Sequence, residues 1–339
     1  METTPARISR RRLLAGAAGT AGAAALATAA GTAPAAAAVT IPAPSPYALK
    51  LPHQIEAEAL VDNLRLLPWG FEANRYKAAG TPLEGLSSSV RWGAPGHPED
   101  FYNLSQCSSF VSLVLERAYG TAPTKPASAL PWPAYSYGWA NEQYFRDNFY
   151  VDKTDTKDFP NAQEYRAAFA RKAEPGGADA LPHFTSVTKP VNLRPGDLVA
   201  FEYEDDNPSP YTGHIVMIRE RKGIWTDPEI DRLVGPNVIP YVFEIIDCTS
   251  SPHGGPSLGG AATELYQAFP DTRFEEIKAT TGQSTFVKHN GVGYGHMIFY
   301  ANADTKLFAG HRWSVTSQTP HTVAERPIAA GRVWLSDSL

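Results

Sequence analysis

Apolar side chains recur three and four residues apart in the segment 105–120, SQCSSFVSLVLERAYG. This spacing places them on one face of an α-helix. Ser105 is suited to the N-cap of this helix and Gly120 to its C-terminal end. Cys107 is therefore expected in the first turn of a helix whose apolar face is buried. The same spacing predicts two further helices, at residues 53–67 and, on the surface of the protein, at residues 162–173.

The second half of the chain carries short apolar runs bounded by turn residues. Short links between consecutive runs favour an antiparallel sheet. The 29 prolines and 27 glycines indicate many turns and loops. A helix followed by such a sheet predicts an α+β fold. The expected strands are residues 197–203, 213–220 and 241–249, with later candidates at 295–301 and 312–316.

Residues 1–38 have the composition of an export signal. Four arginines among residues 7–12 precede a weakly apolar stretch rich in Ala, Gly and Thr, a pattern typical of twin-arginine export. The Pro- and Ala-rich residues 39–52 are expected to form a linker. We therefore expect an exported protein, extracellular or associated with the cell wall. An uncleaved membrane anchor is the alternative, although the stretch is weakly hydrophobic for a span. No later segment is long and apolar enough to cross a membrane.

The remaining residues, 53–339, are expected to form a single catalytic-type domain with insertions at 121–190 and 250–293. Segment 132–150 is dense in Tyr, Trp and Phe. We interpret it as the wall of a substrate groove, because these side chains suit surfaces that are half apolar and half wet; ordinary core is the alternative. Segment 253–260, HGGPSLGG, lacks the Lys and the helix of a phosphate-binding loop and is predicted to be a flexible loop.

Charge narrows the set of partners. The chain has 30 Lys and Arg and 35 Asp and Glu, a net charge of −5. Without residues 1–38, 26 basic residues would face 34 acidic ones, a net charge of −8. This balance argues against nucleic acid and anionic membranes as partners and leaves peptides or glycans. The histidines and cysteines show no metal-binding spacing, so we expect neither a metal nor a cofactor.

Three residues carry candidate chemistry, in the order Cys107, His214 and Asp247. The N–H groups and the dipole at a helix N-terminus stabilise a thiolate and can hold the oxyanion formed when a carbonyl is attacked. His214 begins a predicted strand and can act as the base for the thiol. Asp247 ends the next strand, so antiparallel pairing would bring it beside His214 to orient the ring. Taken singly, each also has a structural interpretation, as a core cysteine, a structural histidine or a turn aspartate.

The segments QCSSFV, RPGDLVAFEY, TGHIVMI and FEIIDCTSS together resemble the NlpC-type cell-wall cysteine peptidases, which belong to the papain-like group with the CHAP enzymes. The resemblance spans residues 92–250. It implies a papain-like core in which a nucleophile helix packs on an antiparallel sheet, with long loop insertions. It also implies an exported cysteine hydrolase that cleaves amide bonds in peptidoglycan peptides. Cys107 would be the nucleophile, His214 the base and Asp247 the residue that orients His214.

The chain departs from the pattern of this family at several positions. Gln106 replaces an acidic residue, Ser109 replaces a glycine, and Val90 stands where a tyrosine is common. The third member of the triad is commonly His in the family rather than Asp. The missing tyrosine leaves the oxyanion site open. The candidates for oxyanion or substrate contacts are Ser108, Tyr102 and Trp92.

Other interpretations stay open. A disulfide between Cys107 and Cys248 would remove the nucleophile. We favour the free thiol, because in a strand Cys248 points away from the side of its neighbour Asp247. His296 and His311 also follow glycines, and His296 is an alternative base. The fold could also serve a non-catalytic wall-binding or interaction protein, or a thiol acyltransferase or hydrolase acting on a substrate outside the wall.

Overall fold

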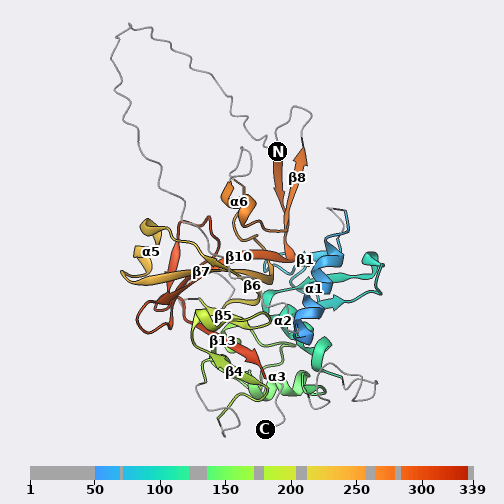
Figure 1. Ribbon diagram of the computed structural model, residues 1–339. Coiled ribbons are helices and arrows are strands. Elements are labelled where there is room, and N and C mark those ends of the chain that lie inside the picture. Colours follow the sequence, from blue (N-terminus) through green and yellow to red (C-terminus); the bar gives the residue numbers. More distant parts are fainter. Residues whose placement is uncertain are drawn as a thin grey trace, which may run out of the picture. The chain divides into compact units, whose positions relative to one another are not determined.

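The computed structural model (Figure 1) describes residues 50–68, 72–121, 136–171, 179–203, 212–256, 264–278 and 284–334. All of them belong to the second of the two units into which the chain divides, Ala37–Leu339. The expected export signal and residues 39–49 of the expected linker lie outside the described residues. Within the described segments, no helix has both the length and the apolar content needed to cross a membrane.

The centre of the fold is an eight-stranded sheet with the order β12-β11-β10-β7-β6-β5-β13-β4. Each neighbouring pair of strands runs antiparallel. Together with the helices, this sheet confirms the expected α+β fold. The strands are β4 (Phe184–Val187), β5 (Leu198–Glu202), β6 (Gly213–Ile224), β7 (Val238–Thr249), β10 (Gly291–Asn302), β11 (Phe308–Arg312), β12 (Pro320–Thr322) and β13 (Ile328–Val333).

Four of the five expected strands are present, as β5, β6, β7 and β10. The last three are longer than expected, at 12 residues each, because residues beyond the apolar runs also pair across the sheet, as Arg221 of β6 does with Phe243 and Val292 of β10 does with Cys248. The strand expected at 312–316 is wrong. Strand β11 ends at Arg312, and a turn follows in which the Ser317 N–H donates to the Ser314 carbonyl.

Both faces of the central sheet are covered, and successive residues of a strand belong to different cores. In β6, Ile215 and Met217 pack with the helices in one hydrophobic cluster, whereas Val216 and Ile218 pack in a second cluster on the other face. Because both faces are apolar, the central strands read as continuous apolar runs rather than as alternating patterns.

Six α-helices lie in the described residues. Helix α1 packs on α2, and α2 packs on β6 and β7 (Figure 1). Helix α1 ends at Leu64, three residues before the predicted end, because the Leu66 and Leu67 N–H groups turn back to carbonyls only three residues earlier. The helices are α1 (Pro52–Leu64), α2 (Cys107–Tyr119), α3 (Glu142–Asn148), α4 (Ala162–Phe169), α5 (Pro228–Val234) and α6 (Glu264–Ala268), with short 3₁₀ turns η1 (Pro98–Asp100) and η4 (Pro190–Asn192).

Helix α2 begins at Cys107, which confirms the predicted place of this residue in the first turn. Its N-cap is Gln106, so the prediction of Ser105 is wrong. Ser105 ends strand β3 (Tyr102–Ser105), where its hydroxyl donates to Asn103 Oδ1 at 2.6 Å. Strand β3 lies between β1 (Asn74–Tyr76) and β2 (Ser89–Arg91) in a three-stranded sheet, which fixes the point at which α2 starts.

Both expected insertions contain helices and strands, and those of the first insertion join the core. Helix α4 ends at Phe169 instead of residue 173, and the prediction of a surface helix is wrong, because Tyr165, Ala168 and Phe169 are buried where α4 packs on β5 and β13. Strand β4 of the same insertion pairs with β13. The insertion at 250–293 holds α6 and the hairpin of β8 (Phe274–Lys278) and β9 (Ser284–Lys288).

The aromatic segment 132–150 belongs to the core where it is described, from residue 136 onward. Tyr144, Phe145, Phe149 and Tyr150 are buried. The centre of the Phe149 ring lies 4.7 Å from that of Tyr165 on α4. The interpretation of this segment as a groove wall is therefore wrong for its described part, because the rings pack against one another. Residues 132–135 lie outside the described residues.

The burial of Phe149 gives a test of this core. We expect Phe149→Ala to lower the free energy of unfolding by about 3–5 kcal/mol, because it removes a buried ring and leaves a cavity. Urea denaturation measures this change. Val151→Ala is the matched control, since Val151 is 77% exposed, and a surface change of this kind shifts stability by no more than about 0.5 kcal/mol. Equal stability of the two variants would contradict the core assignment.

Candidate functional site

The turn between β3 and α2 positions Cys107. The Gln106 backbone N–H donates to Ser109 Oγ at 2.9 Å, and the Gln106 side-chain amide donates to the Lys77 carbonyl at 3.1 Å. Gln106 and Ser109, two of the departures from the family pattern, thus hold the start of the helix. Cys107 itself is 7% exposed.

The first turn of α2 presents backbone donors beside the thiol. The first hydrogen bond inside the helix runs from the Phe110 N–H to the Gln106 carbonyl at 2.9 Å. The N–H groups of Cys107 and Ser108 precede it and have no intrahelical acceptor. Such groups favour a negatively charged oxygen at this end of the helix.

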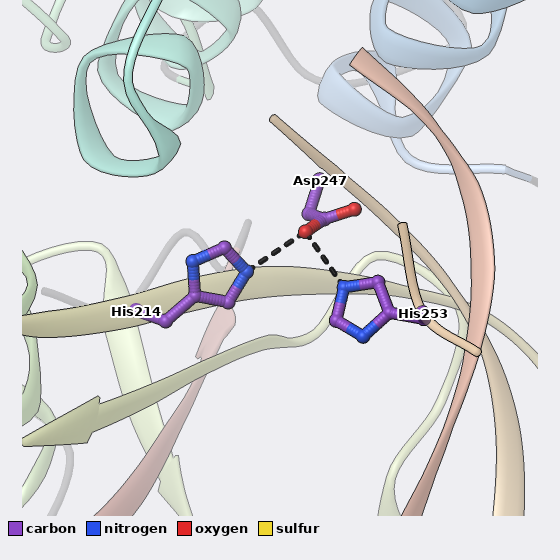
Figure 2. A group of neighbouring side chains, drawn as sticks. All are labelled: His214, Asp247 and His253. Atoms are coloured by element: carbon purple, nitrogen blue, oxygen red, sulfur yellow. Dashed lines mark hydrogen bonds and ion pairs between the residues drawn. The ribbon is translucent and has the colours of Figure 1, made fainter. Parts of the chain in front are cut away.

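Strands β6 and β7 bring His214 and Asp247 into contact. The two strands pair antiparallel, with Met217 opposite Ile246, so the start of β6 lies beside the end of β7. His214 Nε2 donates to Asp247 Oδ2 at 2.8 Å (Figure 2). Because an ionised carboxylate only accepts hydrogen bonds, the His214 proton sits on Nε2, and Nδ1 is free to exchange a proton with another group.

Cys107 lies beside His214, because its charge and a hydrogen bond with its side chain are both among the causes that raise the pKa of this histidine. Since Asp247 occupies Nε2, the ring nitrogen that faces the thiol is Nδ1, which points away from Asp247 in Figure 2. Burial favours the neutral ring, but the negative charge of an ionised Cys107 and the hydrogen bonds that the ring donates to Asp247 and Cys107 outweigh it. Together they raise the pKa of His214 to about 9.

Asp247 is fully buried and its charge is compensated on both oxygens. Burial opposes ionisation. The Arg273 guanidinium, 2.8 Å from Oδ1, and the two histidines at Oδ2 overcome it and hold the pKa of Asp247 well below its usual range. The same carboxylate charge, with that of Asp271, overcomes burial and raises the pKa of Arg273.

His253 is the second imidazole on this carboxylate (Figure 2). Its Nε2 lies 2.9 Å from Asp247 Oδ2 and its Nδ1 lies 2.6 Å from the Trp313 carbonyl. Both of its ring nitrogens therefore lie at hydrogen-bond distance from an oxygen acceptor. The His253 backbone N–H donates to Asp271 Oδ2 at 2.8 Å, and Asp271 in turn binds Arg273 through both of its oxygens.

His253, Asp271 and Arg273 are buried residues of this network that the sequence pattern does not reveal. His253 begins the segment predicted to be a flexible loop, yet it is buried, so the prediction is wrong at this residue; residues 257–260 lie outside the described part. The glycines in β10 were the one feature of the sequence that could have indicated these residues. A Cβ on Gly293 would meet the Arg273 side chain at 2.9 Å, and one on Gly295 would meet Asp271 at 2.7 Å. Glycines inside a strand mark such close approaches.

The same three side chains could surround a cation, since the ligand atoms of His214, Asp247 and His253 lie within 4.8 Å of one another. A metal would need the lone pairs of both Nε2 atoms. In the structure these atoms lie at hydrogen-bond distance from a single carboxylate oxygen, and Arg273 already supplies a positive charge to Asp247. The three side chains therefore fit a hydrogen-bonded network better than a metal centre.

Cys248 lies apart from this chemistry. Both cysteines are free, so the proposed Cys107–Cys248 disulfide is absent. The Cys248 thiol donates to the Ser105 carbonyl at 3.4 Å, the Asn103 side-chain amide donates to its sulfur, and the Ser105 hydroxyl oxygen lies 3.4 Å from that sulfur. Burial raises the pKa of Cys248 to about 12, which leaves it a neutral packing residue.

The remaining sequence candidates lie at different places. Trp92 Nε1 donates to the Glu56 carbonyl, and Arg117, in the last turn of α2, lies over its ring. Trp92 is thus at the opposite end of α2 from Cys107. Tyr102 carries Arg91 over its ring at 5.0 Å. Ser108 is buried directly after Cys107.

The two alternative histidines are held elsewhere. His296 Nδ1 donates to the Pro270 carbonyl at 2.9 Å, and burial lowers its pKa. His311 is fully buried, its ring nitrogens have no hydrogen-bond partner among the described residues, and burial lowers its pKa strongly. The contacts of the described residues thus place His214, and neither of these two, against the thiol.

The raised pKa of His214 predicts a pH dependence of stability. The folded chain binds this proton more tightly than the unfolded chain, because the pKa rises from 6.5 to about 9. The stabilisation is complete below pH 6.5 and is lost as the pH rises through about 9. We expect a loss of about 3 kcal/mol over this interval, measured by urea denaturation. His214→Gln should lack this loss, and the exposed control His97→Gln should retain it. Parallel curves for wild type and His214→Gln would contradict the assignment.

Comparison with known proteins gives no indication of what this site does. No family model, no curated protein and no solved structure matches the chain. What the site does is therefore inferred from its own chemistry: a thiol at a helix N-terminus, an imidazole hydrogen-bonded to it, and a buried carboxylate behind the imidazole.

Proposed function

We propose that the protein is an exported cysteine hydrolase that cleaves amide bonds in peptidoglycan peptides, built on a papain-like NlpC-type core. The observation that carries the proposal is the chain of hydrogen bonds from Cys107 through His214 to Asp247. The order of the elements supports it, because α2 precedes the antiparallel strands β5, β6 and β7 in the sequence and packs against two of them.

The reaction begins with a thiolate on Cys107 and an imidazolium on His214. The thiolate attacks the carbonyl carbon of the scissile amide, and the carbonyl electron pair moves onto oxygen. The N–H groups of Cys107 and Ser108 lie at the helix end where this oxyanion would form. When the carbonyl reforms, the C–N bond breaks, and His214 Nδ1 gives its proton to the leaving amine.

Water completes the cycle. His214 is now neutral, with its remaining proton on Nε2 at Asp247. Its Nδ1 takes a proton from a water molecule, which attacks the thioester carbon. Collapse of this second oxyanion releases the carboxylic acid and returns the thiolate and imidazolium. Asp247 keeps the ring in one orientation and one tautomer through both halves of the reaction.

Two features support the cell wall as the location of the substrate. The resemblance of the segments around Cys107, His214 and Asp247 is to wall peptidases, and residues 1–38 have an export pattern. A net charge of −8 without those residues agrees with a peptide or glycan substrate better than with nucleic acid.

Cys107→Ser tests the nucleophile. We expect it to lower the release of peptides from purified peptidoglycan, followed by mass spectrometry, by at least about 10³-fold. Cys248→Ala is the matched control, because the buried Cys248 thiol donates to the Ser105 carbonyl, and it should retain activity if it folds. Wild-type activity in Cys107→Ser would contradict the proposal. No activity in either protein, with both folded, would favour the non-catalytic wall-binding interpretation.

Alkylation separates a reactive thiol from a structural one. We expect iodoacetamide to modify Cys107 at pH 6, and His214→Gln to slow this reaction by at least about 10-fold, because the imidazolium that stabilises the thiolate is lost. Mass spectrometry locates the label, and Cys248 should stay unmodified in the folded chain. An unchanged rate in His214→Gln would contradict the ion pair. Activity that is lost to a chelator and restored by zinc would instead indicate a metal at His214, Asp247 and His253.

A further inference from the structure

A cation lies over two aromatic rings beside the proposed active site. The guanidinium carbon of Arg326 is 4.8 Å from the centre of the Tyr203 ring and 5.8 Å from that of Trp313. The two rings meet edge to face, 6.1 Å apart. All three side chains are partly exposed.

Arg326 has no carboxylate partner among the described residues. Other arginines near the sheet are paired, as Arg332 is with Asp197 and Arg273 is with Asp247 and Asp271. The neighbouring acid, Glu325, accepts hydrogen bonds from the backbone and hydroxyl of Thr322 instead. The guanidinium is therefore held by stacking, with its charge uncompensated by an ion pair in the described part of the chain.

The same rings connect Arg326 to the reacting groups. Trp313 lies edge to face with His214, with ring centres 5.5 Å apart, and its carbonyl accepts from His253. Tyr203 lies close enough to the thiol that, after burial, the charge of an ionised Cys107 is the largest cause raising the pKa of this phenol. Arg326 thus contacts two rings, of which Trp313 also contacts His214 and Tyr203 also feels the charge of Cys107.

Stacking on aromatic faces restrains a guanidinium while its edge N–H groups stay free to donate. Two such groups match the two oxygens of a carboxylate, and a charge-assisted pair of this kind is stronger than a neutral hydrogen bond. An anionic group of the substrate is therefore the ligand that this arrangement favours.

We propose that Arg326 binds a carboxylate of the peptide substrate and makes the site selective for acidic peptides over their amidated forms. This proposal rests on the proposed function in one respect, that a peptide enters the site beside Cys107. It assigns Arg326 a role in specificity, with Tyr203 and Trp313 as the residues that position it.

Binding to an inactive form separates this role from catalysis. The full chain carrying Cys107→Ala is titrated by calorimetry with wall-derived tetrapeptides whose carboxylates are free, and with the same peptides after amidation. We expect the free acids to bind about 10- to 100-fold more tightly. Arg326→Gln in the same background should bind both forms equally, and Arg326→Lys should restore part of the preference, because it keeps the charge but loses the planar pair of donors.

Arg146→Gln is the matched control. Arg146 also stacks on an aromatic ring, with its guanidinium carbon 5.4 Å from the centre of the Tyr150 ring, but it lies on α3 and contacts none of the site residues. It should leave the preference unchanged.

Two results would overturn the assignment. One is an unchanged preference for the free acids in a folded Arg326→Gln protein. The other is equal affinity for both peptide forms in the Cys107→Ala chain, together with tighter binding of the free acids once the acidic residues 204–206 are neutralised. That combination would mean that the chain's own carboxylates occupy Arg326. The wild-type protein could also cleave no peptide and yet show a carboxylate preference that Arg326→Gln abolishes. This result would support the binding role of Arg326 and contradict the proposed hydrolase activity.

Discussion

The fully buried charge of Asp247 is the constraint on which the site depends. An unpaired carboxylate in a protein interior is costly, and removing one partner of a buried pair is strongly destabilising. Three side chains compensate the charge of Asp247 on β7: Arg273, which directly precedes β8, His214 on β6, and His253 in the loop after β7. One carboxylate thus ties together four parts of the chain, and His214 cannot rotate without losing its share of that charge.

The antiparallel pairing of β6 and β7 sets the positions of His214 and Asp247. Because β6 starts where β7 ends, a histidine at the head of one strand meets an aspartate near the end of the next. The three-stranded sheet around β3 then delivers the N-terminus of α2 to the other side of the imidazole. The thiol and the carboxylate lie at different nitrogens of one ring, which is the arrangement that the proposed proton transfer needs.

The sequence was sufficient to predict Cys107 in the first turn of a helix and Asp247 beside His214, because regular periodicity fixes these positions. Helical spacing sets Cys107 in a first turn, and strand pairing sets Asp247 beside His214. His253, Asp271 and Arg273 could not be found in this way, since they join through side chains from irregular segments that have no period. The surface position predicted for α4 and the groove wall predicted at 132–150 failed for a related reason: burial of aromatic residues depends on which neighbours the tertiary fold supplies.

The network behind His214 carries a consequence for the electrostatics of the whole site. The Arg273 guanidinium bridges the Asp247 and Asp271 carboxylates, and His253 binds the same two side chains through Nε2 and its backbone N–H. No group of this network has to exchange a proton for Cys107 and His214 to do so. Moving a proton between Cys107 and His214 interconverts an ion pair and two neutral groups, so the buried centre has the same total charge in both states. The fold can therefore present either form to a substrate without taking up a compensating ion.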